Sequence, residues 1–174
     1  GVGKALGRKL LGGESAFLTG YTAKVRGAWV ALSPPYPGDV ICTDLDGVLL
    51  SEAGSLLGYS GNIELSIKTT RMANVMGREG LTFLELKGKG QVLLSTYGAH
   101  NCFNLSAGQA VVVDTGHLVA YEPSVNVEFG YLGGLKTATT SGEGMVSRFT
   151  GPGKVYVQSR AEKDIRSWLF PKKS

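Results

Sequence analysis

The chain has 174 residues, of which 43% are hydrophobic and 18% are charged, and its formal net charge at pH 7 is +4. These proportions are typical of a globular domain and exclude a disordered chain. No apolar run reaches the ~18–20 residues that a membrane-spanning helix needs, and the mild positive charge does not by itself indicate a nucleic-acid-binding protein. The 26 glycines follow no collagen-like period, so they predict many turns and many short strands.

Three segments resemble one another along the chain, and each holds a glutamate followed later by a glycine. The glutamates are Glu14, Glu79 and Glu143. The glycines are Gly27, Gly90 and Gly153. The glutamates are 65 and 64 residues apart, and the glycines are 63 apart both times. Such a period is typical of tandem supersecondary units, so residues 1–174 are predicted to form one β-repeat domain.

The spacing of the repeat predicts where each module begins and ends. Residues 34–96 form the second module, residues 97–159 the third, and residues 160–174 a C-terminal helix and tail. Only 13 residues precede Glu14, whereas 45 separate Ser33 from Glu79. Residues 1–33 are therefore expected to be the remainder of a truncated first module.

Each repeat is predicted to contain a β-hairpin. Residues 81–86 and 91–94 are strand formers around the turn 87–90, and residues 145–149 and 154–157 flank the turn 150–153. Glycine supplies the positive φ that tight hairpin turns require. A second pair of segments, 54–59 and 116–121, also matches at an offset of 62.

The string Ile-Cys-Thr-Asp-Leu-Asp-Gly-Val-Leu over residues 41–49 matches the signature of haloacid dehalogenase-like phosphatases. Asp44 would be the nucleophile and Asp46 the general acid and base, with Mg²⁺ neutralising the phosphoryl group. That chemistry needs a parallel strand in an α/β fold, and short β-runs follow here instead. We therefore interpret the motif as a hairpin turn, which Asp and Gly favour.

Other candidate chemical groups are incomplete. Asp114, Thr115 and Gly116 form the triplet of aspartic proteases, but that mechanism needs two such triplets, so a turn is predicted. His100 and His117 would serve a zinc site with Asp114, or a Ser95 or Cys102 nucleophile, yet the spacing and orienting groups are missing. We expect both histidines to cap backbone groups. Cys42 and Cys102 have no partner at metal-ligand spacing and favour a reducing, intracellular environment.

The three recurring glutamates allow two interpretations. Glu14, Glu79 and Glu143 would form a ring of metal ligands, or each would lock its own hairpin by accepting backbone N–H bonds. The lock is favoured. The glycines at 133 and 134 miss the spacing of a phosphate-binding loop because Leu135 precedes Lys136. No catalytic, cofactor-binding or metal-binding residue is therefore assigned.

A helix is predicted near residues 160–169. Ser159 and Glu162 have the spacing of a capping box ahead of an apolar stripe, and Pro171 ends the element. The stripe consists of Ile165, Trp168 and Leu169.

Residues 94–99, 111–120 and 133–153, which include the strings DTGHL and FTGPG, resemble the "altered inheritance of mitochondria" family over nearly the whole chain. The resemblance implies an all-β fold of tandem TRAP-like modules, of the double-stranded β-helix or sandwich type, with a short C-terminal helix. It also implies a cytoplasmic protein if the source is prokaryotic and a mitochondrial one if it is eukaryotic. It supplies no catalytic residues.

These inferences together predict a non-enzymatic structural or assembly protein, linked through the family to membrane or mitochondrial organisation. Edge strands that need pairing predict a homo-oligomer, a trimer or larger closed ring. The first alternative is a TRAP-like nucleic-acid-binding module, which would use Lys87, Lys89 and Lys154. The second is a Mg²⁺-dependent phosphatase that uses Asp44 and Asp46.

Overall fold

The computed structural model describes residues 19–70, 81–131 and 145–170, and the chain divides into two compact units, residues 1–33 and 34–174. In the first unit, residues 19–33 contain a turn at which the N–H of Ala28 donates to the carbonyl oxygen of Val25 (3.4 Å), and Gly27 has a φ of 81°. The described part of this unit holds no strand, and the first half of the hairpin expected there lies outside the described residues.

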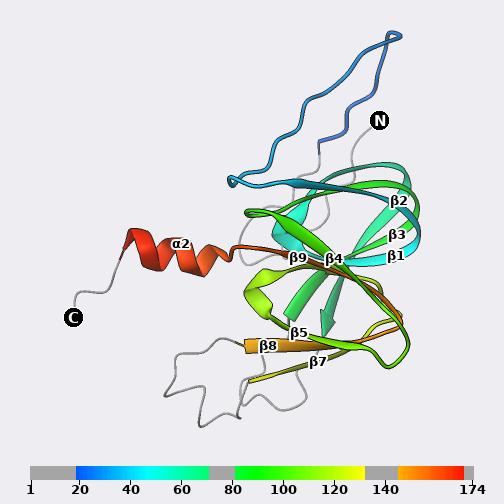
Figure 1. Ribbon diagram of the computed structural model, residues 1–174. Helices are drawn as coiled ribbons and strands as arrows, with labels where there is room; N and C mark the ends of the chain where they lie inside the picture. The colour runs from blue at the N-terminus through cyan, green and yellow to red at the C-terminus, as the bar shows by residue number, and fades with distance from the viewer. Residues whose placement is uncertain (1–18, 71–80, 132–144, 171–174) are drawn as a thin grey trace. The chain divides into compact units, whose positions relative to one another are not determined.

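The described part of the second unit is an antiparallel β-structure followed by a short helix (Figure 1). Its elements are β1 (Val40–Glu52), η1 (Ala53–Ser55), β2 (Leu56–Thr70), β3 (Leu81–Ser95), β4 (His100–Leu105), β5 (Ala110–Asp114), η2 (Thr115–His117), β6 (Leu118–Tyr121), β7 (Asn126–Tyr131), β8 (Met145–Thr150), β9 (Gly153–Gln158) and α2 (Glu162–Leu169). The all-β fold with a short C-terminal helix, as the sequence predicts, is confirmed.

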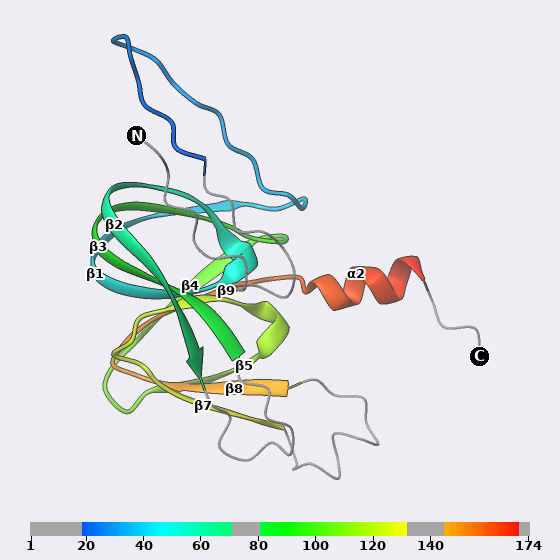
Figure 2. The same ribbon diagram turned by 180° about the vertical axis from the view of Figure 1, so that it is seen from behind.

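The described strands make two sheets. A six-stranded sheet has the order β2-β3-β1-β6-β9-β4, and a three-stranded sheet has the order β5-β8-β7. Figure 2 shows that β1, β2 and β3 lie on one side of β4 and β9, whereas β7 and β8 lie on the other. β2 and β4 are the two edges of the larger sheet.

The predicted hairpin at residues 87–90 is wrong, because these residues lie inside the continuous strand β3. Gly88 of β3 pairs with Gly47 of β1, and Gly90 pairs with Gly61 of β2. Gly88 has a φ of 143° and Gly47 a φ of 137°, so both have a backbone that residues with a Cβ rarely adopt. Two glycine pairs are thus aligned across neighbouring strands, two residues apart along β3, and strand glycines commonly mark a bend.

The predicted hairpin at residues 145–157 is also wrong, although its turn is present. β8 ends at Thr150 and β9 begins at Gly153, but the two strands do not pair with each other. β8 lies between β5 and β7 in the smaller sheet, and β9 lies between β6 and β4 in the larger one. The turn therefore carries the chain from one sheet to the other.

Two apolar clusters form the core, one within the larger sheet and one between the two sheets. The first contains Ile41, Leu45, Leu49, Ile63, Leu84, Leu86, Val92, Leu94, Val119, Ala120 and Tyr156. The second contains Leu50, Phe83, Leu105, Val113, Leu118, Tyr121, Val125, Phe149 and Val155. Phe149 is fully buried and its ring is 5.6 Å from that of Tyr121. Burial of one such side chain contributes about 1.5–3 kcal/mol, so the second cluster binds the smaller sheet firmly to the larger one.

Candidate functional site

Several residues singled out in the sequence lie outside the described parts of the chain. Glu14, Glu79 and Glu143 are among them, as are the glycines of residues 133–134. Neither the metal-ring nor the lock interpretation of the glutamates is tested by the structure.

Asp44 and Asp46 lie within β1 and not in a hairpin turn, so that prediction is wrong. Both side chains are exposed on a strand whose partner β3 is antiparallel. Asp46 accepts a hydrogen bond from Lys89 Nζ at 2.8 Å, and the two residues are register partners across the strands. The carboxylates therefore lack the end of a parallel strand that the phosphatase mechanism requires.

A cleft of about 420 Å³ opens beside these two aspartates. Its walls come from β1, from the turn between β6 and β7, and from β9. The lining residues are Thr43, Asp44, Leu45, Asp46, Val48, Leu49, Glu122, Pro123, Ser124, Lys154 and Tyr156. Glu122 and Tyr156 were not predicted from the sequence. They reach the cleft through the order of the strands in the sheet, and no sequence motif records that order.

The cleft is held in shape by polar contacts between its walls. Tyr156 Oη lies 3.4 Å from Thr43 Oγ1, which joins β9 to β1. Glu122 Oε2 accepts a hydrogen bond from the N–H of Lys154 at 3.0 Å, which joins the turn to β9. No group of three or more His, Cys, Asp or Glu residues in the described ranges is arranged to hold a metal ion. The cleft suits a ligand with an apolar part and positive charge.

The Asp-Thr-Gly triplet forms a turn, as predicted. Asp114 caps η2 by accepting a hydrogen bond from the N–H of Gly116 at 2.9 Å, and it accepts another from Lys163 Nζ at 2.6 Å. Burial raises the pKa of Asp114, but these hydrogen bonds and the charges of Lys163 and His117 outweigh it, so the pKa lies below its usual value. The turn thereby anchors the first residues of α2.

The histidines have structural partners. His117 Nδ1 lies 2.9 Å from the carbonyl oxygen of Gln158. Because a carbonyl only accepts, Nδ1 carries the proton. This confirms the expected capping role for His117. His100 differs, because its Nδ1 lies 2.9 Å from Asp39 Oδ2 and so contacts a carboxylate instead of the backbone.

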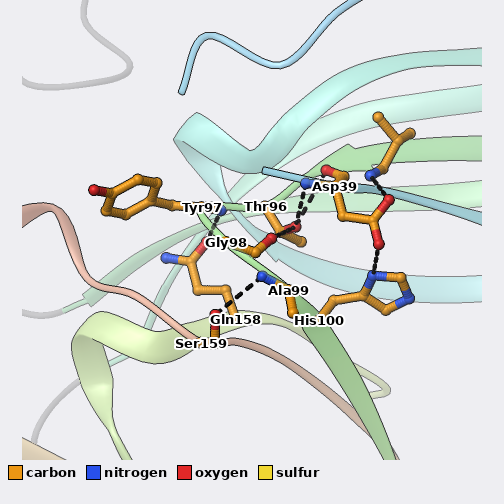
Figure 3. A network of polar contacts seen from close by, with 9 residues as sticks. Asp39, Thr96, Tyr97, Gly98, Ala99, His100, Gln158 and Ser159 are labelled. Atoms are coloured by element: carbon orange, nitrogen blue, oxygen red, sulfur yellow. Dashed lines mark hydrogen bonds and ion pairs between the residues drawn. The ribbon is translucent and has the colours of Figure 1, made fainter. Parts of the chain in front are cut away.

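Asp39 and His100 belong to a polar network between the start of β1, the segment after β3 and the end of β9 (Figure 3). The buried Thr96 exchanges hydrogen bonds with Asp39. Gln158 accepts from the N–H of Tyr97 at 2.9 Å and donates to the carbonyl oxygen of Gly116 at 3.2 Å. Apart from the contact between His100 and Asp39, each contact described here has a backbone group as one partner, which is the arrangement of a structural joint.

The candidate nucleophiles are not activated. Ser95 is buried and donates to the carbonyl oxygen of Ser55 at 3.2 Å. Burial raises the pKa of the Cys102 thiol, which makes the reactive thiolate scarcer. Cys42 and Cys102 are both free thiols. Among the described residues, none of these three forms a hydrogen bond with His100 or His117.

The capping box predicted for α2 is wrong. The helix begins at Glu162, and Ser159 Oγ accepts a hydrogen bond from the N–H of Ala99 at 3.0 Å instead of capping it. Ala161 is buried against Gly116, and a Cβ on that glycine would lie 3.1 Å from Ala161 Cβ. Within the described ranges, no helix has the length and apolar character to cross a membrane.

One known protein family matches most of this chain. The family described as "Mitochondrial biogenesis AIM24" matches residues 1–160. The chain belongs to the AIM24 family. This confirms the resemblance to the altered inheritance of mitochondria family that the sequence motifs indicate.

Two relatives of this AIM24 chain come from Streptococcus pyogenes. An uncharacterized protein of serotype M6 is 27% identical over 165 residues, which cover 91% of this chain and 66% of the relative. The X-ray crystal structure of a protein from the same species has a TM-score of 0.67 at 24% identity and covers 79% of this chain and 61% of that one. The crystal structure supports the fold, and the chain spans less than two thirds of each relative's length.

Proposed function

We propose that this AIM24 protein is a non-enzymatic assembly protein that acts as a homo-oligomer, in the membrane or mitochondrial organisation to which the family resemblance points. The observation that carries the proposal is the position of β2, which is an edge of the larger sheet among the described strands. This strand runs from Leu56 to Thr70 and pairs with β3 on one side, at the end of the six-stranded sheet. A long edge strand is a template for pairing with another chain.

The edge of β2 has few of the features that prevent such pairing. Over its 15 residues it carries no proline and two charged residues, Glu64 and Lys68. Lys68 is already 3.7 Å from Glu85 on the neighbouring strand. β4, at the opposite end of the same sheet, contains no Asp, Glu, Lys or Arg. Pairing of one copy's β2 with the next copy's β4 would form a closed ring if the rotation closes, and we propose a trimer or larger ring.

The non-enzymatic part of the proposal is supported by the partners of the polar side chains. Asp114, His117 and Gln158 each bond to backbone groups, and Asp46 is paired with Lys89. Lys89 and Lys154, which a nucleic-acid site would use, lie beside carboxylates that compete with phosphate.

We also propose that residues 34–96 and 97–159 are two copies of one module. In the first, the order is β1, η1, β2 and β3. In the second, β4 and β5 precede η2, and β6 to β9 follow it. The two short 3-10 helices begin 62 residues apart, at Ala53 and Thr115. Each long strand of the first copy would correspond to two shorter strands, separated by a turn, in the second.

Light scattering of the intact protein tests the assembly. We expect an oligomeric mass at micromolar concentration. Ser60→Lys/Ser66→Lys places two charges on exposed positions of β2 and should reduce the mass, because edge lysines oppose strand pairing. Ser106→Lys/Ala107→Lys, in the exposed turn before β5, is the charge-matched control and should keep the wild-type mass. A wild-type monomer would refute the proposal, whereas an unchanged mass in the β2 variant would refute only the edge contact.

A further inference from the structure

The distal end of α2 exposes three large apolar side chains. Trp168 is 77% exposed, Leu169 54% and Phe170 78%. Together with the half-buried Ile165, Trp168 and Leu169 have the i, i+3, i+4 spacing that places side chains on one face of a helix. A single exposed apolar residue is ordinary, but a contiguous group on a short helix marks an interaction surface.

The helix is fixed at its other end. Lys163 is bonded to Asp114, and Ala161 is 1% exposed. Both views show α2 directed away from the strands of its own unit (Figures 1 and 2). The anchored base therefore presents the apolar end of α2 to another molecule.

The cleft beside β1 is complementary to the apolar end of α2. Leu45, Leu49 and the 6% exposed Tyr156 provide an apolar lining. Its volume of about 420 Å³ lies in the range of about 300–1,000 Å³ typical of ligand pockets. Such a cleft accepts an aromatic side chain.

Charge complementarity favours the same pairing. The cleft lining holds three carboxylates, those of Asp44, Asp46 and Glu122, against one lysine, Lys154. Asp46 is paired with Lys89, but Asp44 has no ion-pair partner among the described residues. The sequence around the apolar end of α2 is basic, with Arg166 before it and Lys172 and Lys173 after it.

We propose that the apolar end of α2 in one copy inserts into the cleft of a second copy, where the carboxylates of Asp44 and Glu122 attract the basic sequence that surrounds this end. The same copy's cleft is not the target. It opens at Lys154 and Tyr156 of β9, whereas α2 begins at Glu162, after the end of β9 at Gln158, and is directed away from the strands. This contact rests on the proposed self-association and supplies a specific interface for it.

A mixing experiment with two full-length variants tests the contact. Trp168→Ala/Phe170→Ala removes the helix surface, and Asp44→Lys reverses the charge at the cleft. All three residues are exposed, so both variants should fold. Each alone should lose about tenfold or more in association constant. Mixed in equal amounts, they should associate more strongly than either variant alone, because the intact helix of one meets the intact cleft of the other. Val112→Ala, at another exposed apolar residue, should keep the wild-type mass.

Tryptophan fluorescence separates this contact from self-association in general. The chain has two tryptophans, so Trp29→Phe leaves Trp168 as the reporter. We expect Trp168 emission to shift to the blue and to resist acrylamide quenching in the oligomer, and Asp44→Lys to abolish both effects. An oligomer in which Trp168 stays fully quenchable would overturn the helix–cleft contact and leave self-association standing. A monomer would overturn both. A blue shift that requires added lipid vesicles would overturn the choice of partner.

Discussion

Asp114 accepts hydrogen bonds from the N–H of Gly116 and from Lys163 Nζ, and thereby joins a 3-10 turn to the C-terminal helix. Its neighbour His117 reaches the carbonyl oxygen of Gln158, at the end of the strand that leads to the same helix. Asp114 and His117, which resemble catalytic residues in the sequence, here anchor α2. At the scale of single residues, the polar groups of the DTGH motif account for the position of the helix.

The lowered pKa of Asp114 predicts a pH-dependent contribution to stability. A carboxyl whose folded pKa is depressed stabilises the fold above its unfolded pKa, near ~3.9, and loses that contribution as pH falls through the folded value. Asp114→Asn should lower the free energy of unfolding by about 1 kcal/mol at pH 7, a modest value because both partners are partly exposed. Urea denaturation should show that the difference in unfolding free energy between wild type and Asp114→Asn becomes smaller below about pH 4.

Asp44→Asn is the matched control for this measurement. Its carboxylate has no ion-pair partner in the described residues, and its replacement should change stability by less than about 0.5 kcal/mol. A difference for Asp114→Asn that is constant from pH 7 to pH 3 would contradict the linkage argument.

At the scale of the elements, the bend shared by β1, β2 and β3 depends on aligned glycines. A Cβ on Gly88 would collide with the carbonyl oxygen of Asn62, and the φ of 143° is unfavourable for any residue with a side chain. Gly88→Ala should therefore destabilise the protein by about 2–4 kcal/mol, through backbone strain and overpacking together. Thermal or urea unfolding measures this loss.

Gly130→Ala, on β7, provides the comparison. A Cβ there meets no atom within 4 Å, and the residue does not have a positive φ. This variant should stay within about 0.5 kcal/mol of wild type. Equal stabilities for the Gly88 and Gly130 variants would show that the bend tolerates side chains.

Residue patterns predicted the class of each element better than its pairing. The β-rich runs at residues 81–94 and 145–157 are strands, and the apolar stripe at Ile165, Trp168 and Leu169 is helical. The hairpin predictions were wrong for a physical reason. A glycine in a strand-forming run is compatible with a hairpin turn or with a bend, and what decides is the residue facing it across the sheet. Gly88 faces Gly47, 41 positions earlier in the chain, which no local pattern contains.

The candidate site was predicted less well than the fold. Asp44 and Asp46 were selected for a phosphatase motif, but their neighbours in space are Glu122, Lys154 and Tyr156. These residues come from a turn and a strand more than 70 positions away along the chain, and they meet β1 through the order β1-β6-β9 of the sheet. Sequence spacing carries no information on that order.

At the scale of the whole molecule, the net charge of +4 limits binding to polyanions. Lys89 is paired with Asp46, and Lys154 lines a cleft with three carboxylates, so part of the positive charge is already compensated. We expect single-stranded RNA to bind no more tightly than about 10 μM at physiological salt. If about four phosphates are contacted, affinity should fall by about 50-fold between 50 and 200 mM salt.

Fluorescence anisotropy with a labelled oligonucleotide at several salt concentrations measures both quantities. Submicromolar binding that persists at 200 mM salt would contradict this prediction and would favour the nucleic-acid-binding module. An acidic oligopeptide with the same charge as the oligonucleotide serves as the control for nonspecific electrostatic attraction.

The aligned glycines also constrain how the sequence can diverge. Inserting one residue between Val40 and Gly47, or between Leu81 and Gly88, would move one glycine out of line and would turn the following side chains to the opposite face of the sheet. Length changes in β1, β2 and β3 therefore have to be compensated in the partner strands at the same time. The turns at residues 106–109, 122–125 and 151–152 interrupt the strands of the other half and relieve this constraint. Descendants of this chain should accumulate insertions at those three turns and keep the lengths of β1 and β3.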